Sequence, residues 1–169
     1  MINFVFNSKG RENYGEIAKI IKQYYNYDVP VIICVGSDLV VGDSLGPIVG
    51  SSLVKLLQGK AYVYGTLTSP VTAREVPIIY DKIKRLHPRS KTIVIDAAVG
   101  NKEDIGLIKI YTDGIKPGLG VNKNLPKIGD LSIIGIVGDK NESLSGVRLN
   151  LVSLLSRDII NGLCLAFTK

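Results

Sequence analysis

The 169-residue chain has only one histidine, His87, two cysteines, Cys34 and Cys164, and no tryptophan. Structural zinc sites usually have four His or Cys ligands, one more than these three residues provide, so such a site is excluded on count alone. His87 is expected to be solvent-exposed at the end of a helix, at the amino edge of the predicted sheet, away from any nucleophile at the opposite edge. The sequence therefore predicts neither zinc chemistry nor Ser–His or Cys–His catalysis, and both cysteines are expected to be reduced core residues.

Long apolar runs are also missing. Charged or strongly polar residues interrupt every hydrophobic stretch before it reaches the roughly 18 residues that a membrane-spanning helix needs. Residues 1–9 hold a short apolar patch without a basic region or a small-residue cleavage site, so no secretory signal is predicted. With 46% hydrophobic and 21% charged residues, the chain is expected to form one soluble, cytoplasmic domain over residues 1–169.

Basic residues outnumber acidic ones and give a net charge of +6, but they are spread along the chain. The densest basic stretch, residues 82–91, is expected to be the exposed face and end of a helix. It lacks a zinc-finger, homeodomain or RNA-recognition signature, so a nucleic-acid partner is not expected.

Segments rich in β-branched residues alternate with segments of helical period, a pattern typical of a layered α/β domain. Strands are expected at 31–35, 61–64, 92–95, 106–111 and 131–137, and helices at 14–26, 45–58, 74–86 and 147–163. The segments 92–95 and 106–111 lie too close in sequence for a crossover helix, so they are expected to form an antiparallel hairpin. We predict a three-layer α/β/α sandwich of the phosphorylase/hydrolase-like type around a mixed sheet of about five strands, with residues 1–28 as an N-terminal helical segment that packs on it.

Polar residues follow the first three of these strands, at the carboxyl edge where α/β sheets bind ligands. Asp96 directly ends an apolar strand, and Asp43 precedes a helix. Each could be only a turn or helix cap. As a pair, however, two carboxylates can share a proton or bind a water molecule between them. The other candidate residues at this edge are Ser37, Asp38, Thr66 and Thr68.

The glycine-bearing loop after the first of these strands is not a phosphate-binding loop. The spacing from Gly36 to Gly42 is one residue too long, and Asp43 stands where a P-loop has its lysine. No dinucleotide fingerprint follows a strand either, so nucleotide chemistry is not expected.

Four motifs, in this order, resemble the sporulation protein YyaC family: GSDLVVGDSLGP (36–47), YGTLTSP (64–70), VIDA (94–97) and KPGLGVNKNLP (116–126). That family is similar to the spore germination protease and, more distantly, to the hydrogenase maturation proteases. The resemblance implies that Asp43 and Asp96 correspond to the two essential aspartates of the germination protease. It also implies a substrate-binding role for the loop that carries Gly118, Gly120 and Asn122.

The match to these families has departures. Hydrogenase maturation proteases add a histidine to the two acidic residues when they bind the nickel-bearing end of their substrate, and this chain has no histidine after His87. Leu39 and Val40 stand where related chains often have a polar pair, and Ala98 stands where a cysteine often follows.

The resemblance implies a sporulation-associated peptidase of the forespore or spore interior, in which Asp43 and Asp96 activate a water molecule. The substrate would be a protein or peptide, such as the small acid-soluble spore proteins. The alternative is a non-catalytic sporulation protein that keeps the pocket for binding or regulation. No cofactor is expected, and the metal alternative is a divalent cation held by the oxygens of Asp38, Asp43 and Asp96.

Overall fold

The computed structural model describes residues 3–8, 13–25, 28–116 and 127–168. In this part of the chain, strands and α-helices occur in the order β1 (Asn3–Asn7), α1 (Tyr14–Tyr24), β2 (Val31–Cys34), α2 (Leu45–Leu56), β3 (Tyr62–Tyr64), α3 (Val76–Leu86), β4 (Thr92–Gly100), β5 (Leu107–Tyr111), β6 (Leu131–Asp139) and α4 (Leu149–Phe167). Short 3₁₀ helices are η1 (Val41–Asp43), η2 (Lys102–Asp104) and η3 (Leu144–Gly146).

The strands form one mixed sheet in the order β1-β5-β6-β4-β2-β3. Strands β3, β2, β4 and β6 run parallel, and β5 is antiparallel to both of its neighbours. The expected hairpin of β4 with β5 is wrong, because β6 lies between them and pairs with both. The connection through η2 reaches across one strand, and the almost wholly buried β6 takes the central position that its apolar sequence favours.

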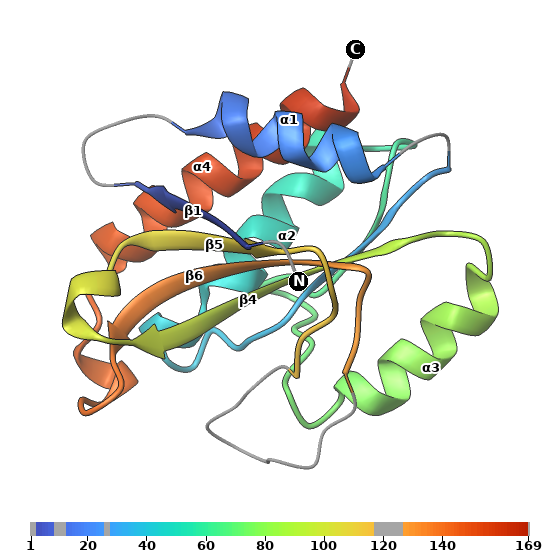
Figure 1. Cartoon of the computed structure of the whole chain (residues 1–169). Helices are drawn as coiled ribbons and strands as arrows, with labels where there is room; N and C mark the ends of the chain where they lie inside the picture. The colour runs from blue at the N-terminus through green and yellow to red at the C-terminus, as the bar shows by residue number, and fades with distance from the viewer. Residues whose placement is uncertain (1–2, 9–12, 26–27, 117–126, 169) are drawn as a thin grey trace.

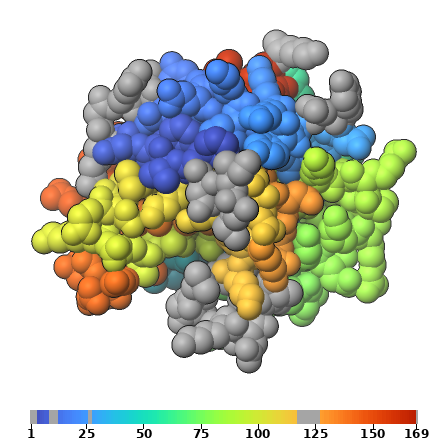
Figure 2. Space-filling model, in the orientation of Figure 1, coloured from blue at the N-terminus to red at the C-terminus, as the bar shows by residue number. Residues whose placement is uncertain are grey.

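Helices cover both faces of the sheet, which confirms the predicted three-layer α/β/α sandwich. Helices α1, α2 and α4 lie on one face and α3 lies on the other (Figure 1). The larger core packs Ile17, Leu53 and Ile159 from the three helices against the sheet, and the smaller core packs α3 against β2 and β4. In the same view, α1 and β1 form the blue upper part of the filled surface and α3 its green lower right (Figure 2).

The N-terminal segment contributes a strand as well as the expected helix, so the sheet has six strands in the described residues instead of about five. In β1, Phe6 is buried and Phe4 packs against the larger core, whereas Val5 is exposed. The short apolar patch thus alternates with the period of a strand. It forms one because it pairs antiparallel with β5.

Helix α4 is, by length and composition alone, long and apolar enough to cross a membrane. Its fully buried Val152, Leu155, Ile159 and Leu163 belong to the larger core, against α1 and α2. This stripe of the helix therefore belongs to the core of the domain.

The residues expected to be chemically inert have the following environments. Cys34 is fully buried, and its burial raises the pKa of its thiol. Cys164 is half-buried. His87 is half-buried instead of fully exposed: its ring stacks on Tyr62 at 3.9 Å, and its Nε2 lies 2.7 Å from the hydroxyl of Tyr64. These partners lie on β3, at the sheet's edge.

Candidate functional site

A cavity of about 430 Å³ lies on the face of the sheet that carries α3, where strands β4, β6 and β5 extend beyond the smaller core. Its lining includes side chains from all three strands, from η1 and η3, and from the segment after β5. The residues are Asp43, Asp96, Ala97, Ala98, Val99, Gly100, Lys109, Tyr111, Ile115, Lys116, Ile134, Ile136 and Leu144. Both predicted catalytic aspartates therefore line one cavity, with a mainly apolar floor.

Asp96 lies in the middle of β4 and not at its end, so the expectation that it terminates the strand is wrong. The last residue pair between β2 and β4 is Cys34 with Ile95, and β4 continues beside β6 to Gly100. Asp96 is thus the first residue of β4 beyond the end of β2. The residue is only 6% exposed, and its Oδ1 accepts a hydrogen bond of 2.9 Å from the Ala97 backbone amide.

Asp43 is held at the cavity by a loop that folds back on the end of β2. The Ser37 amide donates a hydrogen bond of 3.1 Å to the Asp43 carbonyl, and Gly36 makes this close return possible. Gly36 has φ +140°, and a Cβ at this position would overlap the Asp43 carbonyl oxygen. Gly36 thus allows the loop to bring Asp43 next to the end of β2.

Helix capping does not explain the presence of Asp43. Ser44 occupies the N-cap of α2, and its side chain makes no capping hydrogen bond. Its hydroxyl instead donates to the Val41 carbonyl at 2.7 Å. The carboxyl group of Asp43 is partly buried, and burial raises its pKa above the ordinary aspartate value, an effect that a hydrogen bond from the Ser37 amide partly offsets.

This raised pKa predicts that Asp43→Asn stabilises the protein at neutral pH. When the pKa of a carboxyl is higher in the folded than in the unfolded state, the folded state binds more protons, so stability is lost as pH rises from the unfolded-state pKa through the folded-state pKa. We expect the variant to melt about 1–3 °C above the wild type at pH 7, and the difference to vanish near pH 3, where both states are protonated. Thermal melts across this range check the prediction, and a constant difference at every pH would contradict it.

The other predicted residues have different environments. Asp38 is exposed, and the Ser37 hydroxyl accepts a hydrogen bond from the Leu39 amide within its own turn. The hydroxyls of Thr66 and Thr68 lie 3.2 Å apart in the turn after β3. None of these four is among the described residues that line the cavity, and their substrate-binding role stays a prediction. Gly118, Gly120 and Asn122 lie outside the described residues.

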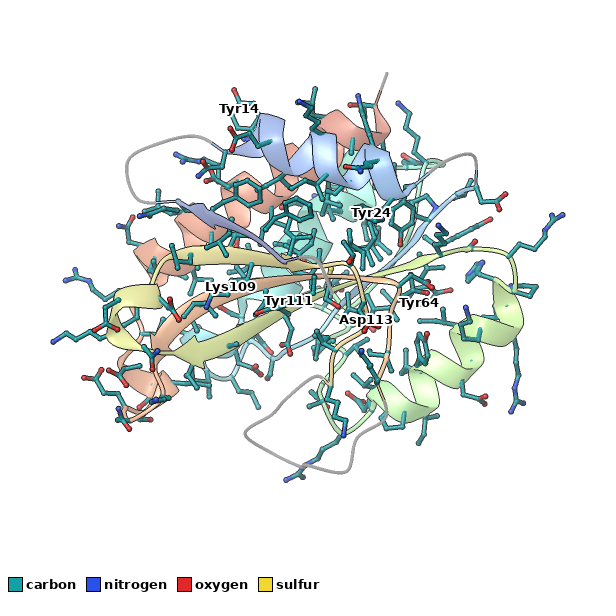
Figure 3. All side chains as sticks on the ribbon, viewed as in Figure 1. Tyr14, Tyr24, Tyr64, Lys109, Tyr111 and Asp113 are labelled. Atoms are coloured by element: carbon teal, nitrogen blue, oxygen red, sulfur yellow. The ribbon has the colours of Figure 1, made fainter. Side chains whose placement is uncertain are left out.

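Sequence reasoning missed the cavity residues of β5 and the segment after it. Lys109 and Tyr111 lie along β5, two residues apart (Figure 3). The Lys109 ammonium pairs with Asp104 at 2.9 Å. The sequence shows that Lys109 and Tyr111 alternate with the apolar Ile108 and Ile110. Only the strand order shows that the face of β5 with Lys109 and Tyr111 borders the aspartates.

The base of the segment between β5 and β6 is closed by an antiparallel bridge. Ile115 and Ile128 exchange two backbone hydrogen bonds of 2.9 Å, and Lys127 pairs with Asp113. This bridge sets Ile115 and its neighbour Lys116 as a wall of the cavity. The ammonium groups of Lys109 and Lys116 add positive charge to a cavity that also holds two carboxyls.

A cation site of three carboxylates gains no support from residues 3–8, 13–25, 28–116 and 127–168, which contain no group of three or more His, Cys, Asp or Glu placed to hold a metal. The set Asp38, Asp43 and Asp96 stays a hypothesis. Elemental analysis of protein purified without chelator, beside the Asp43/Asp96 double variant, tests it.

Comparison with known proteins identifies the family of this chain. The family described as "Protein of unknown function (DUF1256)" matches residues 5–162. The chain belongs to the DUF1256 family. A relative, "Uncharacterized protein YyaC" of Bacillus subtilis (strain 168), is 39% identical over 139 residues, which are 80% of this chain and 68% of the relative. The resemblance to YyaC is thereby confirmed.

The fold of this DUF1256 member is similar to that of a [NiFe] hydrogenase maturation protease, HycI from Thermococcus kodakarensis KOD1. The TM-score is 0.61 at 14% identity, over 89% of this chain and 99% of HycI. At this identity the likeness concerns the fold, which is protease-like. The expected relation to hydrogenase maturation proteases is confirmed at that level, and the likeness to the germination protease stays a prediction.

Proposed function

We propose that this DUF1256 protein is a sporulation-associated peptidase in which Asp43 and Asp96 activate a water molecule for peptide hydrolysis. The observation that carries the proposal is that both aspartates line one cavity although they are 53 positions apart in the chain. The protease-like fold and the relation to YyaC support it.

The two carboxyls would have different roles. Burial raises the pKa of Asp43, which favours its protonated form, so we assign it the proton that polarises the substrate carbonyl. We assign the role of general base to Asp96. It would take a proton from the water as the water oxygen attacks the carbonyl carbon, and it would return that proton to the leaving amine when the C–N bond breaks.

The remainder of the cavity suits a peptide. Its floor presents the apolar side chains of Ala98, Ile134 and Ile136, while Lys109 and Tyr111 provide hydrogen-bond donors beside the aspartates. A protein or peptide substrate is therefore proposed, with small acid-soluble spore proteins as the first to test.

The test is incubation of the purified protein with small acid-soluble spore proteins and with a peptide library, followed by mass spectrometry. Peptide fragments that form with the wild type, and not with Asp43→Asn, support the proposal. Equal cleavage by both proteins, or by neither, overturns it. Binding without cleavage would favour the alternative of a non-catalytic protein that keeps the pocket as a binding or regulatory site.

A further inference from the structure

A second cavity, also of about 430 Å³, lies beyond the end of β6, beside the start of α4. Val99 and Leu144 line both cavities, so the two are neighbours on either side of these side chains. Neither aspartate of the proposed catalytic pair is among the described residues of the second cavity. Its lining has therefore to be explained separately.

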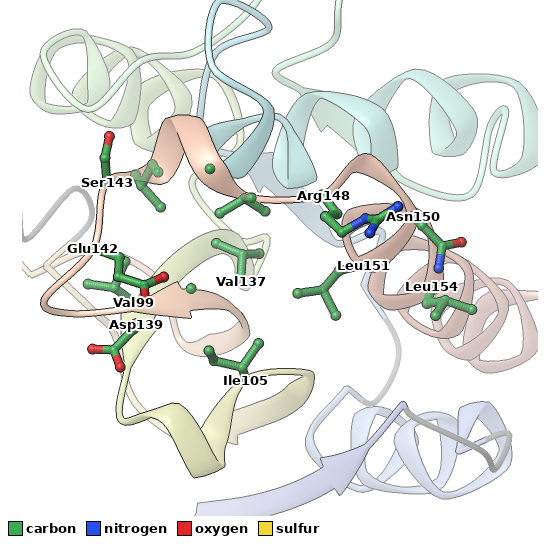
Figure 4. Close-up of a pocket in the computed structure, with 14 residues that line it drawn as sticks. Val99, Ile105, Val137, Asp139, Glu142, Ser143, Arg148, Asn150, Leu151 and Leu154 are labelled. Carbon is green, nitrogen blue, oxygen red and sulfur yellow. The ribbon is translucent and has the colours of Figure 1, made fainter.

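The second cavity has opposite charges at its two ends. Figure 4 shows the carboxylates of Asp139 and Glu142 at one end and the guanidinium of Arg148 at the other, beside Asn150. Within the part of the chain that the structure describes, no ion pair engages any of these three charged groups. The charges are thus available to a ligand.

The middle of this cavity is apolar. Val137, Ile105 and Leu151 lie between the charged ends (Figure 4), and Leu154 and Val147 add to the same wall. The acidic end is also held in place, because Asp139 Oδ1 accepts two hydrogen bonds of 2.9 Å from the backbone amide and the side chain of Asn141. The volume of the second cavity lies within the range of small-ligand sites, about 300–1,000 Å³.

We propose that the second cavity binds a short apolar peptide with both termini free. The peptide's ammonium group would lie against Asp139 and Glu142, its carboxylate against Arg148 and the Asn150 amide, and its apolar side chains on Val137 and Leu151. A ligand with one charge, or with two charges of the same sign, would leave one end of the cavity unpaired. This site goes beyond the proposed peptidase function and does not depend on it.

The test uses Ala-Val-Ala as the probe, with N-acetylated and C-amidated forms of the same tripeptide. Binding is followed by calorimetry and by NMR shifts of the amides of Val137 and Leu151, at low ionic strength so that exposed charges are weakly screened. We expect acetylation of the amino terminus or amidation of the carboxyl terminus to weaken binding about two- to fivefold, which corresponds to the loss of one exposed ion pair. Equal affinity for free and capped peptides, or no binding at millimolar peptide, would overturn the proposal.

Single substitutions test which end of the second cavity binds which terminus of the peptide. Arg148→Gln should abolish the preference for a free over an amidated carboxyl terminus and keep the preference for a free amino terminus, and Glu142→Gln should weaken the second preference. The matched control is Arg89→Gln, an exposed arginine before β4 that should change neither preference. Asp43→Asn should bind Ala-Val-Ala as the wild type does, so failure of the peptidase proposal and failure of this one give different results. An Arg148→Gln protein that keeps both preferences would contradict the assignment.

Discussion

Replacement of Asp96 with asparagine is expected to lower the rate of peptide hydrolysis about 10²–10⁴-fold, the usual contribution of a general base. An asparagine side chain keeps the size of the aspartate and its acceptor oxygen for the Ala97 amide, but it cannot take a proton from water. The measurement is the kcat/KM of a cleaved peptide, determined for the wild type and for the variant. Asp43→Asn should also lower the rate, because an asparagine amide polarises the substrate carbonyl less strongly than a carboxylic acid does.

The matched control for this prediction is Asp28→Asn. Asp28 is an exposed aspartate before β2, and it is not among the described residues of the cavity. The variant should retain nearly full activity, with a melting temperature close to that of the wild type. A comparable loss in Asp28→Asn, or unchanged hydrolysis in Asp96→Asn, would contradict the assignment of the catalytic pair.

Gly36→Ala is expected to destabilise the protein by about 2–5 kcal/mol, from backbone strain at positive φ together with overpacking. The new Cβ would overlap the Asp43 carbonyl oxygen and lie 3.1 Å from Pro47 Cδ, so the loop after β2 would have to move. For a chain of this size the melting temperature should fall by about 5–15 °C. Urea unfolding measures the free energy, and an activity assay should show an additional loss, because Asp43 moves with the loop.

Gly59→Ala separates the effect of backbone strain from the effect of overpacking. Gly59 also has a positive φ, +74°, but a Cβ there would meet no atom within 4 Å. Its substitution should therefore cost only the backbone strain, about 1–2 kcal/mol, and leave hydrolysis unchanged. Equal destabilisation by the two substitutions would show that the contact between Gly36 and Asp43 is not what matters.

Prediction from the sequence was most successful where a local pattern decides the structure. The helical period over α1 and α2 and the short apolar run of β2 depend on burial of one stripe or of both strand faces, and each is visible in neighbouring residues. The loop that carries Asp43 was also predictable from neighbouring residues, because the glycines and Pro47 around it indicate a tight loop that leads into a helix. The relation to YyaC, carried by motifs in order, was also legible in the sequence alone.

Prediction was least successful where a strand's position depends on its partners. Asp96 was expected to end its strand because its polarity breaks the apolar run. Instead β4 continues, because β6 pairs with it up to Gly100. The patch at β1 was too short to indicate a strand until β5 provided its hydrogen bonds.

The sequence by itself determined the layered α/β class and the family, and it proposed Asp43 and Asp96 as candidates, because composition, periodicity and motif order are properties of the chain alone. Only the tertiary structure decided that β6 inserts between β4 and β5. This insertion brings Lys109 and Tyr111 to the cavity of Asp43 and Asp96, and it places a second cavity with opposite charges beyond the end of β6. Strand order depends on contacts between residues far apart in sequence, and the free energy of those contacts is not contained in any local pattern.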